Sequence, residues 1–228
     1  MKLAKVVAVV VLISGSGLFA TPTGINNIPT ADVVADRKVA IQSFGSFGQG
    51  SNQFAANGAG NSSLWMGFKA GIQATAPVRV EIGMDSPVAP TKAGPLVFQT
   101  KANFSPWENG LIALGIANIA LTDFDRAGRP FSYGIVAQDF GFLRAHAGYG
   151  FQLNSNTALF GIDRNLRVLG RTLNLNIDLV QSADHSYWLP AAGFKFDPTQ
   201  YIVLESWANF PGRGRSSYIA KINFVFGV

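Results

Sequence analysis

Apolar and polar residues alternate along several segments of this chain. The clearest alternation covers residues 78–85, where one face carries Val78, Val80, Ile82 and Met84 and the other carries Arg79, Glu81, Gly83 and Asp85. Residues 64–73, 96–104, 143–152 and 173–179 show the same two-residue period. Successive side chains of a β-strand point to opposite faces, whereas an amphipathic helix repeats its apolar positions every three or four residues. We therefore predict that these segments are β-strands with one apolar and one polar face.

Further segments with weaker alternation complete the set of predicted strands. They are residues 38–48, 111–120, 131–140, 158–164, 188–196, 201–210 and 217–228. The total of twelve is even, as is typical of bacterial barrels that cross the outer membrane. The connections tend to alternate in length, since residues 49–63 form a long Gly-, Asn- and Ser-rich connection and residues 74–77 a tight one. Short turns on one side and longer loops on the other are expected of such barrels.

The composition indicates that lipid, rather than water, surrounds part of the chain. Charged residues make up 14% of the sequence and hydrophobic residues 48%, whereas about 25% of the residues in a soluble domain are charged. After residue 20, no apolar run reaches the roughly 18 residues of a membrane-spanning helix. The sequence thus predicts an all-β fold, a closed antiparallel transmembrane β-barrel of about 12 strands. A soluble β-sandwich, which also alternates along its strands, is the alternative.

The start of the chain has the pattern of a cleaved signal peptide. Lys2 and Lys5 give it a positive beginning, residues 6–13 are apolar, and residues 14–20 are mostly small. A membrane anchor helix is the alternative, although the uncharged stretch is short for one. We expect a signal peptide (residues 1–20), an N-terminal periplasmic segment (residues 21–37) and the transmembrane barrel (residues 38–228). Export across the inner membrane would deliver such a chain to the outer membrane.

Charged and polar residues at the inward positions of these strands define a candidate lumen lining. The set consists of Lys69, Arg79, Glu81, Asp85, Lys101, Arg144, His146, Asp163, Asp178, Lys195, Glu205 and Lys221. Positive and negative charges are nearly balanced, and buried charges need partners or water, so we expect ion pairs and hydrogen bonds across the lumen. A barrel of this size is intermediate between small filled barrels and wide porins. A packed lumen and a narrow pore with a slight preference for anions both remain open.

The last strand resembles the C-terminal assembly signal of Gram-negative outer-membrane proteins. In that signal an aromatic-rich alternating strand ends the chain, and here Tyr218, Ile222, Phe224 and Phe226 share one face. The resemblance implies an outer-membrane β-barrel that the barrel-assembly machinery inserts into outer-membrane lipid. Residues 24–31, with the sequence GINNIPTA, also resemble the first residues of some barrels associated with polysaccharide export. This second resemblance implies an accessory role in the export of polysaccharide or other cell-envelope material.

Aromatic residues are expected where lipid meets water, because an amphipathic ring suits the headgroup layer. Several aromatic residues fall near the ends of the predicted strands. They are Phe104, Trp107, Phe131, Tyr133, Phe151, Tyr187, Trp188, Tyr201, Phe210 and Tyr218. We predict that these side chains form the two aromatic girdles of the barrel.

The sequence contains no convincing active site. The chain has no cysteine, which excludes disulfides, thiolate metal sites and thiol nucleophiles, and its two histidines are His146 and His185. His185 and Ser186 lie in a predicted outer loop, but residues adjacent in sequence seldom align for proton transfer. Asp123 and Asp125 resemble the start of a calcium loop that lacks its closing glutamate. We predict no enzymatic activity, no metal and no cofactor.

The interpretation that fits these features best is an integral outer-membrane β-barrel, either structural or a narrow passive channel for small solutes. Two alternatives remain open: an accessory barrel in polysaccharide or cell-envelope export, and a rim-located lipid-modifying enzyme. The expected partners are outer-membrane lipid, the barrel-assembly machinery, and small solutes or envelope polysaccharide. Because lysine and arginine form no dense cluster, nucleic acid is not an expected partner.

Overall fold

Most of the predicted strands form a single closed sheet. The computed structural model describes residues 23–47, 63–89, 94–127, 129–153, 155–182, 185–212 and 216–227, so the predicted signal peptide lies outside the described residues. Twelve strands of the described part form a closed barrel with sequential neighbours, and the first of them, β3, pairs with the last, β14. All twelve neighbouring pairs are antiparallel. The predicted closed antiparallel barrel of about twelve strands is confirmed.

The observed strands follow the predicted ones closely. They are β3 (Lys38–Phe47), β4 (Ser63–Thr75), β5 (Val78–Ala89), β6 (Val97–Phe104), β7 (Gly110–Ala120), β8 (Phe131–Asp139), β9 (Arg144–Gln152), β10 (Ser155–Val168), β11 (Arg171–Gln181), β12 (Trp188–Phe196), β13 (Ile202–Asn209) and β14 (Ser217–Gly227). The largest difference is in β10, which was predicted over residues 158–164 only. Its pairing with β11 continues to Val168 and Arg171, because backbone pairing does not require the apolar alternation that ends near Arg164.

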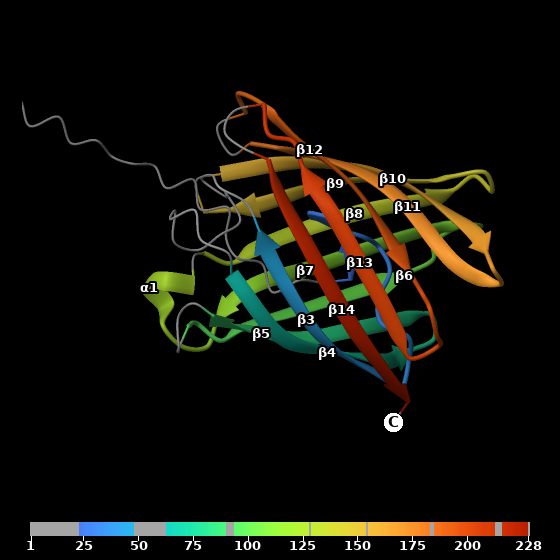
Figure 1. Cartoon of the computed structure of the whole chain (residues 1–228), viewed down its shortest axis with the longest axis horizontal. Coiled ribbons are helices and arrows are strands. Elements are labelled where there is room, and N and C mark those ends of the chain that lie inside the picture. The colour runs from blue at the N-terminus through green and yellow to red at the C-terminus, as the bar shows by residue number, and fades with distance from the viewer. Residues whose placement is uncertain are drawn as a thin grey trace, which may run out of the picture.

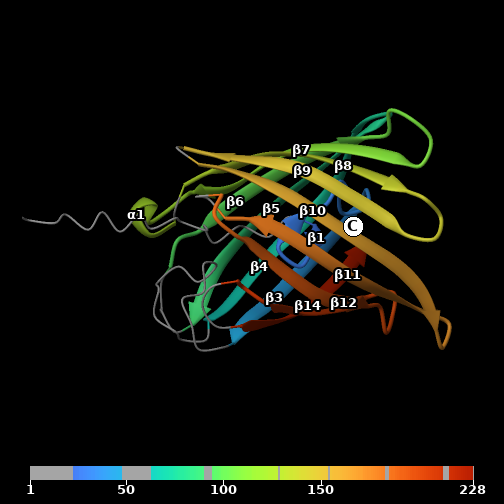
Figure 2. The ribbon, with the colours of Figure 1, turned by 90° about the horizontal axis from the view of Figure 1, so that it is seen from above.

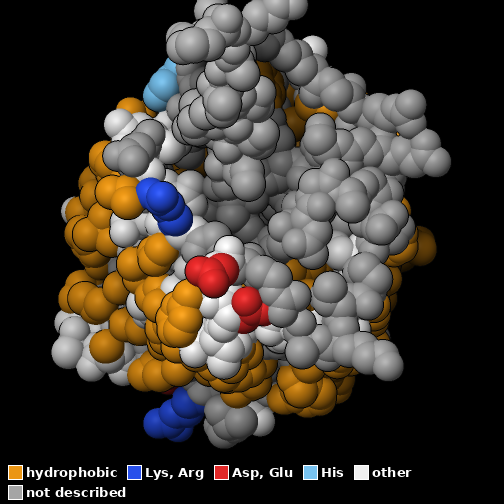
Figure 3. All heavy atoms as spheres, turned by 90° about the vertical axis from the view of Figure 1, so that its left-hand side faces the viewer, with side chains coloured by type: hydrophobic (Ala, Val, Ile, Leu, Met, Phe, Trp, Pro, Cys, Tyr) orange, Lys and Arg blue, Asp and Glu red, His pale blue; other side chains and the backbone are white. Residues whose placement is uncertain are grey.

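The two faces of the strands differ in polarity as the alternation predicts. In the middle of β11, Ile177 is 49% exposed on the outside, whereas its neighbour Asn176 is 6% exposed and faces the interior. Hydrophobic side chains cover much of the visible flanks of the barrel in Figure 3, and few charged side chains interrupt them. An apolar exterior over a polar interior is the arrangement of barrels that sit in lipid.

The two ends of the barrel carry different connections. Two connections begin and end at one end of the barrel, on the left in Figure 1: the first joins the end of β3 to the start of β4, and the second joins β7 to β8. The second of these connections contains the short helix α1 (Phe124–Ala127). Tight turns such as residues 76–77 and 169–170 lie at the opposite end, together with the beginning of β3 and the end of β14. We call these the long-connection end and the short-turn end. Among the described residues, no helix has the length and apolar character needed to cross a membrane.

Residues 23–37, which we call the luminal segment, lie mostly inside the barrel (Figure 2). They begin with a small hairpin of β1 (Gly24–Ile25) and β2 (Ile28–Pro29). Sequence analysis assigned residues 21–37 to a periplasmic segment before the barrel, whereas residues 23–34 lie within the barrel wall and Ala35, Asp36 and Arg37 at the end of the segment are exposed. The physical reason is that its backbone and side chains find hydrogen-bond partners on the inward faces of β5, β6, β9 and β11.

The luminal segment also makes half of the interior apolar. Ile25, Ile28 and Ala31, which we call the apolar tip, pack in one buried cluster with Phe131, Tyr133 and other side chains of β7, β8 and β10. Phe131 and Tyr133 are only 6% and 3% exposed, and their rings stack with centroids 5.7 Å apart. Their predicted place in an aromatic girdle is therefore wrong. They face inward because the apolar tip, and not water, lies opposite them.

Candidate functional site

The interior of the barrel contains the charged residues that the sequence analysis proposed as lumen lining. Eight of the twelve are buried, namely Lys69, Glu81, Asp85, Lys101, His146, Asp163, Asp178 and Lys221. Arg79, Arg144, Lys195 and Glu205 are partly buried. The structure gathers most of them into four groups: a pair of β5 and β6, a single aspartate on β11, a triad of β9 and β10, and a row across β12, β13 and β14.

The pair on β5 and β6 holds both ends of the luminal segment. Glu81, which is 0% exposed, accepts hydrogen bonds from the backbone N–H and the hydroxyl of Thr23, at 2.8 and 2.5 Å, and from the backbone N–H of Val34, at 2.9 Å. Lys101, directly opposite Glu81 in the sheet, donates to the carbonyl oxygens of Thr23 and Thr30, at 2.7 and 3.0 Å. Hydrogen bonds to charged groups are about twice as strong as neutral ones, so this pair is the main anchor of the segment.

A second anchor fixes the hairpin of the luminal segment. Asp178 of β11 accepts hydrogen bonds from the backbone N–H groups of Asn27 and Ile28, at 2.7 and 3.3 Å. The Asn27 side chain donates to the amide oxygen of Asn209, at 2.8 Å, and accepts a hydrogen bond from the indole N–H of Trp207, at 3.2 Å. The turn between β1 and β2 is thus bound to β11 and β13 through polar contacts.

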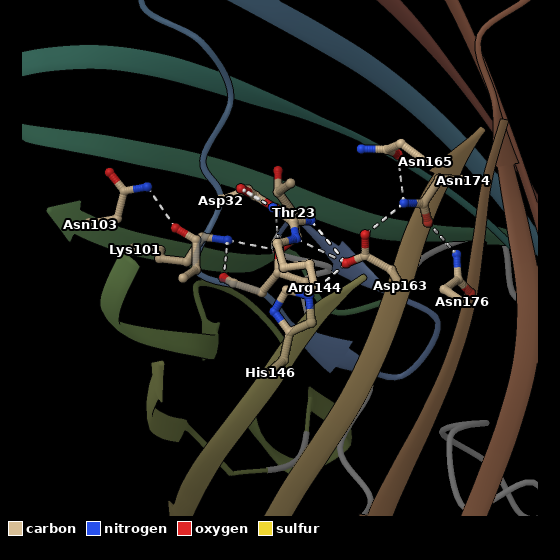
Figure 4. A network of polar contacts seen from close by, with 12 residues as sticks. Thr23, Asp32, Lys101, Asn103, Arg144, His146, Asp163, Asn165, Asn174 and Asn176 are labelled. Carbon is tan, nitrogen blue, oxygen red and sulfur yellow. Dashed lines mark hydrogen bonds and ion pairs between the residues drawn. The ribbon is translucent and has the colours of Figure 1, made fainter. Parts of the chain in front are cut away.

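A third group joins the luminal segment to β9 and β10, as Figure 4 shows. Arg144 forms ion pairs with Asp32 of the segment, at 2.8 Å, and with Asp163, at 3.0 Å. The Nε2 atom of His146 lies 2.6 Å from Asp163, and the side-chain amide of Asn174 donates to the other oxygen of that carboxylate, at 2.8 Å. Burial raises the pKa of Asp32, but the charge and hydrogen bond of the Arg144 guanidinium, together with the nearby Lys101 ammonium, hold that pKa below its ordinary value of 3.8. Asp32 is therefore a charged latch at neutral pH.

The wall is shaped to accept the luminal segment. A Cβ atom at Gly71 would lie 2.1 Å from the carbonyl oxygen of Val34, and one at Gly161 would lie 2.7 Å from the Cδ1 atoms of both Ile25 and Ile28. Any larger residue would collide with the segment. The end of the segment is also bound to β4, the strand that contains Gly71. There the backbone N–H of Arg37 donates a hydrogen bond to the carbonyl oxygen of Gly71, at 3.2 Å.

A cavity of about 480 Å³ lies between the luminal segment and the opposite half of the wall. Lys195 of β12, Glu205 of β13 and Lys221 of β14 are directly opposite one another across neighbouring strands and line it. Lys69 of β4, Lys38 at the start of β3 and Arg144 of β9 are the other basic residues of its lining. Because Lys38 and residues near the ends of β12 and β14 border the cavity, it is located toward the short-turn end.

A second apolar cluster lies closer to the long-connection end. The Trp65 ring is buried with Val97 and Ala127 and stacks on Phe44 with centroids 5.9 Å apart. Trp65 precedes Lys69 on β4, which begins at the long-connection end, so this cluster is between the cavity and that end. This cluster therefore fills interior space between the cavity and the long-connection end.

The remaining chemical candidates do not converge on a reaction centre. His146 is 3% exposed and is held by Asp163, while the exposed His185 and Ser186 lie in the connection between β11 and β12. Asp184 is outside the described residues. Within the described ranges, no group of three or more His, Asp or Glu side chains could hold a metal ion. What the described residues form is a polar interior with an internal segment and a cavity.

Three residues that bind the wall were not among the sequence candidates. Thr23, Asn27 and Asp32 belong to the luminal segment, which the sequence analysis placed outside the barrel. The consecutive Asn26 and Asn27 between two isoleucines are a turn signal, and this could have indicated a hairpin. The sequence offers no comparable indication of where that hairpin docks.

The proposed assembly signal is on the outer face of the closing strand. Tyr218, Phe224 and Phe226 are exposed and Ile222 is partly exposed, all on the face of β14 opposite Lys221 and Asn223. Recognition of these side chains by an assembly machinery stays a prediction. Their exposure places them where lipid or an insertion partner would contact them.

The fold and its polar interior define an outer-membrane β-barrel, and solved porins share this architecture. The KdgM porin matches with a TM-score of 0.56 and 8% sequence identity, over 82% of this chain and 99% of the porin. A second structure shows the KdgM porin in complex with disordered oligogalacturonate, with a TM-score of 0.55 and 8% identity over 82% of this chain and 99% of that one. An outer-membrane channel from Pseudomonas putida F1 matches with a TM-score of 0.50 and 8% identity, over 86% and 97% of the two chains.

Another porin structure has a similar fold. The NanC porin matches with a TM-score of 0.50 and 12% identity, over 81% of this chain and 98% of the porin. At such identities the likeness concerns the fold. No protein-family model and no curated protein matches the sequence.

Proposed function

We propose that this protein is a narrow passive channel for small solutes in the outer membrane, with the luminal segment as a permanent constriction. The observation that supports this most directly is the cavity of about 480 Å³, which has a charged wall on one side and the segment on the other. A purely structural barrel would gain more from an apolar filling, because buried charges cost free energy unless each is paired or hydrated. The short-turn end, by the usual orientation of such barrels, faces the periplasm.

The constriction limits the size of the solute. The apolar tip fills the side of β7, β8 and β10, and the Trp65 cluster narrows the remaining path toward the long-connection end. Small hydrophilic solutes are the class that fits such a path. The oligogalacturonate complex of the KdgM porin supports hydroxylated solutes as candidates, because a related fold accommodates one.

The rest of the proposal concerns delivery and membrane insertion. A signal peptide over residues 1–20 would direct export, and the barrel-assembly machinery would recognise the aromatic face of β14. The outward apolar residues would then contact outer-membrane lipid. No specific observation favours the export accessory or the lipid-modifying enzyme over the channel.

Single-channel recording in planar bilayers tests the channel function. The wild-type barrel is expected to give small, steady currents. Asp178→Ala removes the acceptor of the Asn27 and Ile28 N–H groups and should give larger and noisier currents, because the hairpin loses its anchor. Asn176→Ala is the matched control, since Asn176 lies on the same strand and face and its amide donates to Asn174, at 2.9 Å.

Two results would contradict the proposal. Electrically silent wild-type protein that is demonstrably folded and inserted would show that the lumen is closed. Currents that change equally in Asp178→Ala and Asn176→Ala would show that the luminal segment does not control conduction.

A further inference from the structure

The basic side chains of the cavity outnumber the carboxylates available to them. Lys38, Lys69, Arg144, Lys195 and Lys221 line it, against Asp32, Asp197 and Glu205. Arg144 is paired with Asp32 and Asp163, so it needs no further counter-charge. The three lysines around Glu205 share that carboxylate. Glu81 and Asp85 also act on Lys69, but Glu81 is bonded to Thr23 and Val34 and Asp85 to Gln42.

Glu205 cannot neutralise this group. It lies between Lys195 and Lys221 in the register of β12, β13 and β14, and its Oε1 atom is 3.7 Å from the Lys221 ammonium. The same oxygen accepts a hydrogen bond from Asn223, at 2.7 Å. All three lysines are close enough to Glu205 for electrostatic interaction, so its one negative charge is shared.

The Lys69 ammonium is buried without a bonded partner among the described residues, and this is a second reason, besides the charge balance, to expect an anion in the cavity. Its side chain is 4% exposed and lines the cavity, yet within the described residues it forms neither an ion pair nor a hydrogen bond. A buried ammonium without a partner is costly, and a bound anion would remove that cost. Lys195 likewise has no ion pair or hydrogen bond within the described part of the chain, although Glu205 lies opposite it.

The third carboxylate of the cavity lining, Asp197, does not balance the lysines. Asp197 follows β12 at the short-turn end, and burial raises its pKa above the ordinary value, an effect that the nearby Lys195 offsets only in part. Its buried Oδ1 atom has no hydrogen-bond partner among the described residues. Even with Asp197 and Glu205 both charged, the four lysines that line the cavity, Lys38, Lys69, Lys195 and Lys221, outnumber these two carboxylates.

We infer that Lys69, Lys195 and Lys221 form a binding site for the carboxylate of a small organic acid. The volume of the cavity, about 480 Å³, is in the range of pockets that enclose small molecules. Asn165, Asn174 and Thr172 line it beside the lysines and can bond hydroxyl groups of the ligand, while Val203 and Val225 can contact its carbon chain. A hydroxylated acid fits this lining better than a fully apolar one.

This inference deepens the proposed channel function, and it rests on that function only for its role in solute selection. Binding itself is tested at equilibrium, without any current. Purified barrel in detergent is titrated with sodium gluconate by isothermal titration calorimetry at constant ionic strength. Sorbitol, which has a similar chain of hydroxylated carbons but no carboxylate, is the matched neutral ligand.

Wild-type protein should bind gluconate at least about tenfold more tightly than sorbitol, because each charge-assisted hydrogen bond exceeds a neutral one. Lys69→Met and Lys195→Met should each weaken gluconate binding by about tenfold or more. Lys195→Met is the safer variant for folding, since Lys195 is only partly buried and forms no hydrogen bond or ion pair within the described residues. Arg171→Gln removes one positive charge from the exposed first residue of β11, outside the cavity lining, and should leave binding unchanged.

Several outcomes would overturn the inference. They are equal affinity for gluconate and sorbitol, no gluconate binding, or an equal loss in Arg171→Gln and Lys195→Met, which would indicate general attraction by net charge. Gluconate binding by a barrel that carries no current would remove the channel function and leave the site. Currents without gluconate binding would remove the carboxylate site and leave the channel function.

Discussion

Glu81→Gln tests whether the luminal segment is held by the charged wall. The substitution preserves the shape of the side chain but replaces one carboxylate oxygen with an amide donor. Glu81 accepts hydrogen bonds from Thr23, twice, and from Val34, so at least one of these buried donors would lose its acceptor. Lys101, which lies opposite, would also lose a negative neighbour.

The size of the effect follows from these contacts. Leaving a buried donor unsatisfied costs about 1 to 3 kcal/mol. If the luminal segment opens locally while the barrel stays folded, this cost corresponds to amide exchange about 5 to 150 times faster. The effect should be confined to residues 23–37, because the hydrogen bonds of the barrel strands do not depend on Glu81's charge.

Hydrogen–deuterium exchange followed by mass spectrometry of the folded protein in detergent is the assay. Asp85→Asn makes the same chemical change on the same strand and inward face, where Asp85 accepts a hydrogen bond from Gln42 of the barrel wall. Protection of residues 23–37 should fall in Glu81→Gln and remain nearly wild-type in Asp85→Asn. Unchanged exchange of the segment in Glu81→Gln, or an equal change in both variants, would refute the anchoring role.

Other perturbations test the exterior, the packing and the electrostatic latch. Ile177→Arg should impair folding into lipid vesicles by about 2 to 4 kcal/mol, as expected for a charge facing the middle of the bilayer, whereas Ile177→Leu should have little effect; equal folding free energies would mean that this face does not contact lipid. Gly161→Leu should displace the apolar tip, at a cost of about 1 to 3 kcal/mol, and accelerate exchange of the luminal segment; normal protection would show that the tip is not packed on β10. Because the pKa of Asp32 is lowered, its ion pair with Arg144 should stabilise the fold at pH values above 3.8 and lose this effect as the pH falls through the lowered pKa. The difference in thermal midpoint between wild type and Asp32→Asn should therefore shrink below pH 3.8, and a difference that is constant with pH would contradict the latch.

The barrel could be predicted from sequence because its strands separate two different solvents. Residues such as Ile177 and Asn176 meet lipid and a polar interior at a period of two, and this pattern is local, so it survives without knowledge of the fold. Pairing of β14 with β3 then follows from the need to satisfy every backbone group in lipid.

The luminal segment could not be predicted in the same way. Its polar partners, Glu81 and Asp178, follow Thr23 and Asn27 by 58 and 151 positions, and no local pattern connects residues so far apart. The missing position of the luminal segment also explains why Phe131 and Tyr133 were wrongly predicted to lie in an aromatic girdle. In β8 the more apolar face, which carries Phe131 and Tyr133, points inward, and only the position of the apolar tip shows why.

Chemical access to the luminal segment tests the central claim, that residues 23–34 of this segment are enclosed by the barrel. The chain has no cysteine, so a single introduced thiol reports without interference. Ala31, 0% exposed within the interior, is replaced by cysteine in one variant, and Leu169, 98% exposed in the turn after β10, in another. With a maleimide carrying a large polyethylene glycol, the folded Leu169→Cys protein should be modified rapidly and the folded Ala31→Cys protein only after denaturation. Equal rates of modification in the two folded proteins would show that the segment lies outside the barrel.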